Sequence, residues 1–197
     1  MVAILMKIHV SAMLITQSCM MPSLRFQGIK VRRPLMRAQC VDGVAAGAGF
    51  SLMLACDIRI ASENARFSET FIKRGLIPAD GSCWQLPRII GLSNTLLLQY
   101  TGDRIDGNEA YHMGVVSKVL AADALMEASL ELAARLAQMP TQSLALVKYL
   151  VHKSLDMDFE ESLDLAHVAQ EQVRRTEDHK EAVQAFIEKR QPKFTGR

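Results

Sequence analysis

The sequence has few aromatic residues and little net charge. Aromatic side chains make up 6% of the 197 residues, and the formal net charge is +2. Proteins that bind nucleic acid usually combine a strongly basic face with aromatic rings that stack on bases. Neither feature is present, so nucleic acid is not an expected partner.

Cysteine is scarce, and its spacing is uninformative. The four cysteines, Cys19, Cys40, Cys56 and Cys83, form no C-x-x-C pair and have no histidine at metal-ligand spacing. A zinc site or a redox pair is therefore not expected, and no metal is predicted. Cys40 and Cys56 stand in apolar surroundings and are most simply buried thiols, which favours a reducing compartment.

No apolar run is long enough to cross a membrane. Residues 1–20 are mostly apolar, but Lys7 and His9 interrupt them, and a spanning helix needs about 20 consecutive apolar residues. The same stretch lacks the basic start and the A-x-A site of a signal peptide. We therefore expect no membrane span and a cytoplasmic location, or the mitochondrial matrix if the source is eukaryotic.

The most organised stretch runs from Cys40 to Asp57. It reads as a short apolar strand, a turn at residues 42–43, a loop of small residues at 45–49 and an apolar helix at 50–56. Small residues let another group approach the backbone, and a helix N-terminus presents unpaired N–H groups to negative charge. Taken alone, the stretch is explained at least as well by close packing of the helix on the strand.

Strand and helix patterns alternate in the surrounding sequence, which indicates an α/β unit. The predicted strands are 35–41, 58–61, 66–68 and 115–120; the predicted helices are 83–90, 93–100 and 106–113, and everything after residue 121 reads as helical. Residues 4–16 fit a strand or a helix equally. The predicted organisation is an atypical N-terminal segment at 1–32, an α/β core at 33–120 and a helical region at 121–197.

Four segments in order resemble the crotonase (enoyl-CoA hydratase/isomerase) superfamily. They are PLMRAQCVDGVAAGAGFSLMLACDIRIAS at 34–62, ARFSETFIKRGLIP at 65–78, TGDRIDGNEAYHMGVVSKV at 101–119 and EDHKEAVQAFIEKRQPKFTG at 177–196. The resemblance implies an α/β core of repeated β-β-α turns, a spiral, followed by a C-terminal helical region that makes homotrimers or hexamers. It also implies an acyl-CoA thioester as ligand, with coenzyme A as part of the substrate and no separate cofactor.

In this superfamily two backbone N–H groups stabilise the oxyanion of a thioester enolate. The resemblance places one of these donors at Ala48, between Gly47 and Gly49. The donor belongs to the backbone, so alanine in place of the usual glycine does not remove it. The other donor normally comes from an earlier loop, often with an A-G-x-D pattern, and residues 1–32 contain no such pattern.

The sequence departs from the family at both usual catalytic glutamates. Ser51 and Phe71 stand at these positions. A hydratase uses the two carboxylates to position water and transfer protons, which serine and phenylalanine cannot do. Two-glutamate hydration is therefore disfavoured, while Ser51 and Phe71 remain expected contacts of the substrate.

Two other carboxylates are candidates for proton transfer. Asp80 lies in the loop 75–82, one residue after Ala79, where some family branches carry a working aspartate; a turn aspartate bonded to its own backbone is the alternative. Glu69 precedes Phe71 by two residues, and in an extended segment it would share a face with Phe71. An exposed, solvated Glu69 is the simpler interpretation.

The remaining candidates for substrate binding are Trp84, Phe186 and Lys189. Trp84 could line an acyl pocket, although core packing is the simpler role. Phe186 and Lys189 match a tail motif that in the family lies near the adenine of a neighbouring subunit's coenzyme A. The expected function is an enzyme acting on an acyl-CoA thioester; the alternative is a catalytically inactive member that serves in binding or assembly.

Overall fold

The computed structural model describes residues 4–8, 23–26, 29–32 and 37–197. It divides into two compact units, one containing residues 3–15 and 36–133 and the other residues 16–35 and 134–197 with the first two residues. The three predicted segments group the residues differently, and their status as domains stays a prediction.

The first unit contains most of the strands. Its strands are β1 (Ile4–Ile8), β4 (Arg37–Val41), β5 (Val44–Ala46), β6 (Ile58–Ser62), β7 (Arg66–Ser68), β8 (Arg104–Asp106) and β9 (Lys118–Leu120). Its helices are α1 (Ala48–Leu54), the 3₁₀ turn η1 (Ile72–Arg74), α2 (Ser82–Thr101), α3 (Gly107–Met113) and α4 (Leu125–Ala137), of which the last runs on into the second unit.

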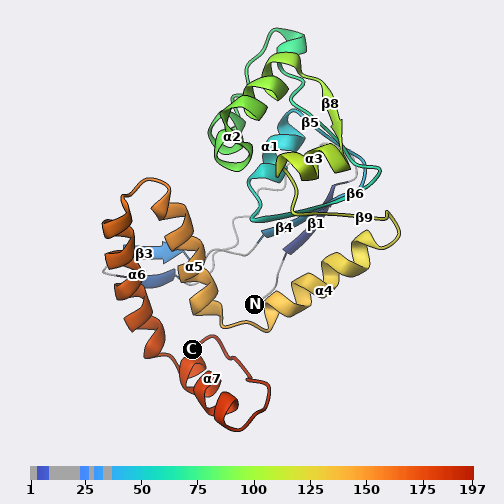
Figure 1. The fold of residues 1–197 in the computed structure, drawn as a ribbon. Coiled ribbons are helices and arrows are strands. Elements are labelled where there is room, and N and C mark those ends of the chain that lie inside the picture. Colours follow the sequence, from blue (N-terminus) through green and yellow to red (C-terminus); the bar gives the residue numbers. More distant parts are fainter. Residues whose placement is uncertain (1–3, 9–22, 27–28, 33–36) are drawn as a thin grey trace. The chain divides into compact units, whose positions relative to one another are not determined.

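One sheet of this unit is parallel, in the order β1-β4-β6-β9. Successive side chains of a strand point to opposite faces, and the core follows this alternation. Cys40 and its partner Ile60 pack against Leu125 of α4, whereas Val41 and Ala61 pack with α1, α2 and α3. Figure 1 shows these three helices on one side of β4 and β6, and α4 on the other.

The second sheet joins β5 in parallel and β8 in antiparallel fashion to β7. The segment Val44–Ala46 therefore forms a strand, and the prediction of a loop over 45–49 was wrong at Ala45 and Ala46. All three residues of this segment pair with β7, which lies about twenty residues further along the chain. Their extended conformation therefore depends on this distant strand. The pairing brings the turn before α1 next to the end of β7.

Helix α2 contains both helices predicted between residues 83 and 100. Gly91 separates them with a non-helical backbone (φ 76°, ψ 169°), and Gly102 ends α2 at φ 60°. The predicted strand at 115–120 was too long, because only Lys118–Leu120 pairs with β6. Val115 and Val116 are instead buried in the core directly after Gly114.

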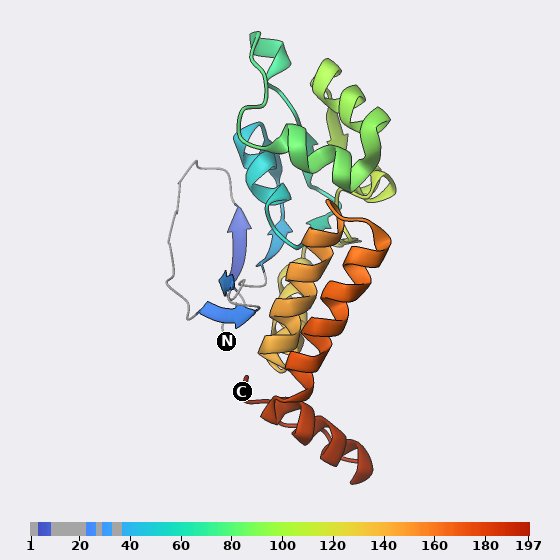
Figure 2. The same ribbon diagram turned by 90° about the vertical axis from the view of Figure 1, so that its left-hand side faces the viewer.

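The second unit contains helices and a hairpin. Its elements are the antiparallel strands β2 (Ser23–Phe26) and β3 (Ile29–Arg32), and the helices α5 (Thr141–Ser154), α6 (Phe159–Arg174) and α7 (Glu177–Ile187). Ala145 and Leu146 of α5 pack on Ala169 of α6, and Figure 2 shows the two helices side by side. Helices α4 to α7 lie within the stretch predicted to be helical after residue 121, but in the described chain no helix follows Ile187. Of the open segment 4–16, residues 4–8 form a strand, while 9–16 lie outside the described residues.

Candidate functional site

The site begins at the turn that leads into α1. Gly47 has φ 53° and ψ −124°, a conformation that side chains rarely adopt. Its N–H donates to the carbonyl of Ser68 at the end of β7 (2.9 Å), and its carbonyl accepts from the N–H groups of Phe50 and Ser51. Ala48, the first helical residue, is exposed, and no described residue accepts a hydrogen bond from its N–H. The first N–H groups of a helix have no acceptor within it, which makes Ala48 a candidate donor to a ligand.

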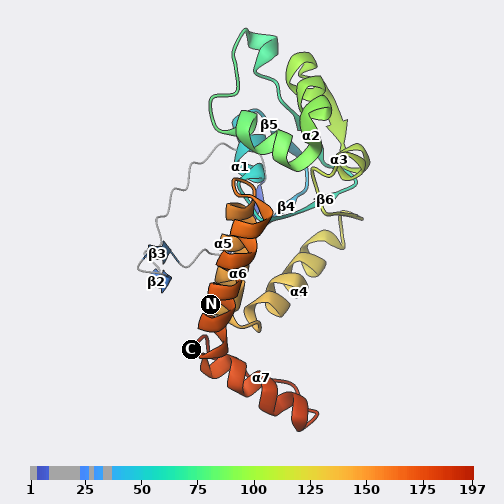
Figure 3. The ribbon, with the colours of Figure 1, turned by 60° about the vertical axis from the view of Figure 1, so that its left-hand side comes forward.

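Ser51 lies one turn further along α1 and holds a carboxylate against the helix. Its side chain is buried (3% exposed), and its Oγ donates to Oδ1 of Asp80 at 2.6 Å. A second acceptor, the carbonyl of Gly47, is 3.5 Å away. The alternative that Asp80 bonds to its own backbone was wrong: the loop before α2 directs its carboxylate to α1. Figure 3 shows α1 and α2 next to each other.

Glu69 is a buried carboxyl group that accepts no hydrogen bond of normal geometry from the described residues. The residue is 1% exposed, and neither of its oxygens has a partner within the described part of the chain; the same holds for the hydroxyl of Ser82, which is fully buried. Burial raises the pKa of Glu69 to about 7, and the charge of Asp80 adds to this. The nearby Ser82 hydroxyl lowers the pKa of Glu69, although the two side chains do not form a hydrogen bond of normal geometry.

The expectation of a solvated Glu69 was wrong, and so was its alignment with Phe71. Strand β7 ends at Ser68, and Phe71 already has helical dihedrals (φ −57°, ψ −45°) at the start of η1. The chain therefore turns between the two residues, and the strand alternation that would place both on one face does not apply. Glu69 goes inward, and Phe71 remains half-buried.

Phe71 contributes an apolar wall beside the glycine turn. A Cβ added to Gly47 would lie 3.5 Å from the Phe71 ring and from the Thr70 hydroxyl. The Phe71 ring thus covers the backbone next to Ala48. Phe71 itself stands at a position where the family pattern has a glutamate. This placement suits a contact with an apolar part of a ligand and offers no group that could transfer a proton.

Trp84 is not a core residue, contrary to the simpler expectation. Its side chain is 51% exposed on α2, and the guanidinium of Arg88 lies 4.0 Å from the ring centroid. This stacking accounts for the orientation of the ring.

Phe186 and Lys189 belong to the other unit, where Phe186 is 85% exposed and Lys189 has φ 53°. The structure thus brings together Gly47, Ala48, Ser51, Glu69, Phe71 and Asp80 among the predicted site residues.

Sequence reasoning missed Ser82. Its only local signal was its position at the start of a helix directly after Asp80-Gly81. Two absences can be added for the residues described here: no helix is long and apolar enough to cross a membrane, and no three side chains of His, Cys, Asp or Glu are grouped as metal ligands.

A parallel sheet, a glycine turn with an open backbone N–H and a carboxylate beside it define an α/β protein of crotonase-like fold. The family model described as enoyl-CoA hydratase/isomerase matches residues 31–197. The chain therefore belongs to the enoyl-CoA hydratase/isomerase family.

Several relatives support this membership. The chain is 37% identical to the 1,2-epoxyphenylacetyl-CoA isomerase of Escherichia coli, over 85% of this chain and 63% of that protein. It is 33% identical to the short-chain-enoyl-CoA hydratase of Clostridium acetobutylicum, over 81% and 60% respectively. The crystal structure of an enoyl-CoA hydratase from Bacillus anthracis matches with a TM-score of 0.79 at 35% identity, covering 84% of this chain and 65% of that one. The chain thus spans less than two thirds of the length of these relatives.

Proposed function

We propose that this chain acts on an acyl-CoA thioester through an enolate, with the N–H of Ala48 as oxyanion donor and Asp80 as the group that moves the proton. The observation that carries the proposal is the 2.6 Å hydrogen bond by which Ser51 holds Asp80 against the helix that Ala48 begins. Membership in the family and the names of the relatives support the class of substrate.

The chemistry can be written as two proton transfers. Asp80 takes a proton from a carbon that is acidified by the thioester; the C–H bond breaks, and its electron pair moves to the thioester oxygen, which accepts from the Ala48 N–H. Return of the proton to another carbon moves the double bond. Hydration would also need a group that activates water, and Ser51 and Phe71 stand where hydratases carry glutamates. Isomerisation is therefore the reaction that we favour.

Other parts of the site remain proposals. Gly47 and Gly49 allow a ligand to approach the turn, Phe71 would contact the acyl chain, and Trp84, Phe186 and Lys189 are candidates for binding. Coenzyme A would arrive as part of the substrate, without a separate cofactor. The segment 1–32, which contains no A-G-x-D pattern for the second oxyanion donor, lies largely outside the described residues.

A catalytically inactive binding or assembly protein is the second candidate. The observation in its favour is that neither glutamate position carries a carboxylate. Loss of one oxyanion donor alone costs on the order of 10²–10³ in rate, so an incomplete oxyanion hole would weaken the enzyme further.

The test compares turnover in the wild type, Asp80→Asn and Asp103→Asn. Asp103 is a matched control, because it is an exposed loop aspartate of the same unit that pairs with Lys73. We expect conversion of 3-enoyl-CoA to 2-enoyl-CoA by the wild type, a loss of at least roughly 10²-fold in Asp80→Asn, and a change of less than about twofold in Asp103→Asn. Coenzyme A binding without turnover by the wild type would instead establish the inactive protein, and full activity of Asp80→Asn would exclude Asp80 as the base.

A further inference from the structure

Two carboxyl groups and two serine hydroxyls lie on α1, after β7 and at the start of α2. Ser51 bonds to Asp80, and Asp80 and Ser82 are near enough to Glu69 to affect its pKa. Ser51, Glu69 and Ser82 are each at least 97% buried, whereas Asp80 comes from an exposed loop. The two carboxyl groups differ in the hydrogen bonds that they accept. Asp80 accepts a short hydrogen bond from Ser51, while Glu69 accepts none from any described residue.

This difference decides which carboxyl group carries the negative charge. A donated hydrogen bond stabilises an ionised carboxylate, whereas burial without a donor favours the protonated form. Neighbouring carboxylates also resist simultaneous ionisation. The pKa of Glu69, raised to about 7 by burial and by the charge of Asp80, agrees with this assignment. Among the described residues, Asp80 is the charged group whose field acts on Glu69, and the adjacent Ser82 is neutral.

We propose that Asp80 and Glu69 form a coupled dyad, in which Ser51 is the positioning residue that holds Asp80 as the charged member and the buried, unpartnered Glu69 is the member that ionises last. The role of Asp80 toward substrate rests on the proposed function; the dyad itself does not. In that reaction Asp80 gains the proton that the substrate carbon loses and later returns it. Ser51 keeps Asp80 in place throughout.

The first test needs no catalysis. The full chain is labelled with ¹³C at its glutamate carboxyl groups, and the resonance that disappears in Glu69→Gln is titrated in the wild type and in Asp80→Asn. We expect a midpoint near pH 7 in the wild type and a lower midpoint in Asp80→Asn, because the repelling charge has been removed. A wild-type midpoint at an ordinary glutamate value, or one that Asp80→Asn leaves unchanged, overturns the dyad.

The second test asks whether Ser51 acts through Asp80. Turnover is measured in the wild type, Ser51→Ala, Asp80→Asn and the double variant. We expect Ser51→Ala to lower kcat roughly 10- to 100-fold, as for the loss of a hydrogen bond to a charged group, and to leave KM within about twofold. It should cause no further loss when Asp80 is already asparagine. Equal losses in both backgrounds, or no loss in either, overturn the positioning role.

Ser62→Ala is the matched control for this cycle. Ser62 is also fully buried, and its hydroxyl donates to Oδ1 of Asp42 at 2.8 Å, so the variant removes the same kind of bond from the same unit. We expect its kcat to stay within about twofold of the wild type; a loss equal to that of Ser51→Ala would mark the effect as structural and overturn the positioning role.

If the wild type has no turnover, the proposed function fails while the titration still decides the dyad. Ser51 is then judged by a crystal structure of Ser51→Ala. Displacement of the Asp80 side chain supports the positioning role, and an unchanged carboxylate overturns it.

Discussion

Glu69 shows how burial changes the acidity of a carboxyl group in a way that the local sequence does not indicate. In water its carboxylate would be hydrated, but inside the protein no described group replaces that hydration. Burial is therefore the largest contribution to its raised pKa of about 7, against an ordinary value of 4.5. Such a group stabilises the fold only while it is protonated.

The stability of the unit that contains Glu69 should consequently fall between pH 5 and pH 8. The folded pKa is above the unfolded one, so the contribution is fully present below pH 4.5 and is lost as the pH rises through about 7. Relative to Glu69→Gln, the wild type should lose roughly 2–3 kcal/mol of unfolding free energy over this interval. Denaturant titrations followed by the fluorescence of Trp84, the only tryptophan, measure this difference; parallel pH profiles of the two proteins would contradict it.

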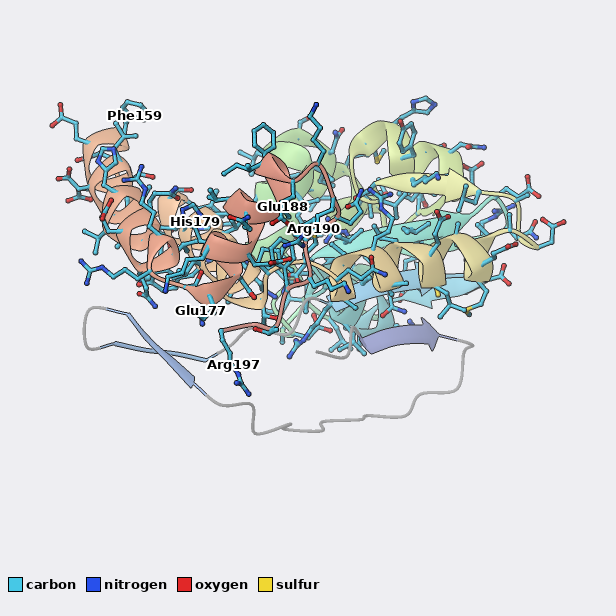
Figure 4. The ribbon with its side chains drawn as sticks, turned by 90° about the horizontal axis from the view of Figure 1, so that it is seen from below. Phe159, Glu177, His179, Glu188, Arg190 and Arg197 are labelled. Atoms are coloured by element: carbon cyan, nitrogen blue, oxygen red, sulfur yellow. The ribbon has the colours of Figure 1, made fainter. Side chains whose placement is uncertain are left out.

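At the scale of elements, the C-terminal segment is attached to α7 by a single buried carboxylate. Asp178 is 4% exposed and accepts hydrogen bonds from the N–H groups of Thr195 and Gly196, at 2.7 and 2.9 Å. Its own N–H donates to the carbonyl of Arg197. Arg190 adds exposed ion pairs with Glu181 and Glu188; Figure 4 shows Glu188 and Arg190 beside each other. Glu181 also accepts from the N–H of Lys193 (2.8 Å), so Asp178 is the buried attachment of this segment and Glu181 a more exposed one.

Replacing Asp178 by alanine should release this segment. Hydrogen bonds to a charged acceptor contribute roughly 1.5–3 kcal/mol, and without them trypsin should cleave after Lys193 faster than in the wild type. Glu177→Ala is the control, because Glu177 lies in the same helical turn but forms only an exposed pair with Lys180. Equal cleavage of both variants, read by mass spectrometry, would show that Asp178 does not hold the segment.

At the scale of the whole molecule, α7 has an apolar face that nothing described in this chain covers. Val183, Phe186 and Ile187 follow the i, i+3, i+4 spacing and are 47%, 85% and 67% exposed. Large exposed side chains on one helix face are typical of a surface that binds another protein. Together with the family resemblance, this face favours self-association of the chain.

We expect the wild type to sediment as a trimer or hexamer and Ile187→Glu to sediment as smaller species, because a charge buried in an apolar contact is costly. Gln170→Glu introduces the same charge at an exposed polar position of α6 and should leave the assembly unchanged. A monomeric wild type in analytical ultracentrifugation, at micromolar concentration, would exclude this assembly.

The sequence by itself determined the features that depend on near neighbours. At the start of α3 the carboxylate of Asp106 accepts from the N–H of Glu109, and the carboxylate of Glu109 accepts from the N–H of Asp106. Gly102 and Gly114 end their helices in the left-handed conformation. The helices from α2 to α7, the fold class and the family also followed from local patterns and their spacing. These features are readable because the residues that cause them lie within a few positions of one another.

Only the tertiary structure decided the character of the candidate site. Ser51 and Asp80 are 29 residues apart in the sequence, and Glu69 receives its environment from Ser82 and Asp80 across a turn. The pairing of β5 with β7 depends in the same way on distant segments. Residue type and spacing do not reveal burial or a distant partner, and these two quantities determine which carboxyl group is charged. The candidate site could be predicted from the sequence, whereas the protonation that we propose for it depends on the packing.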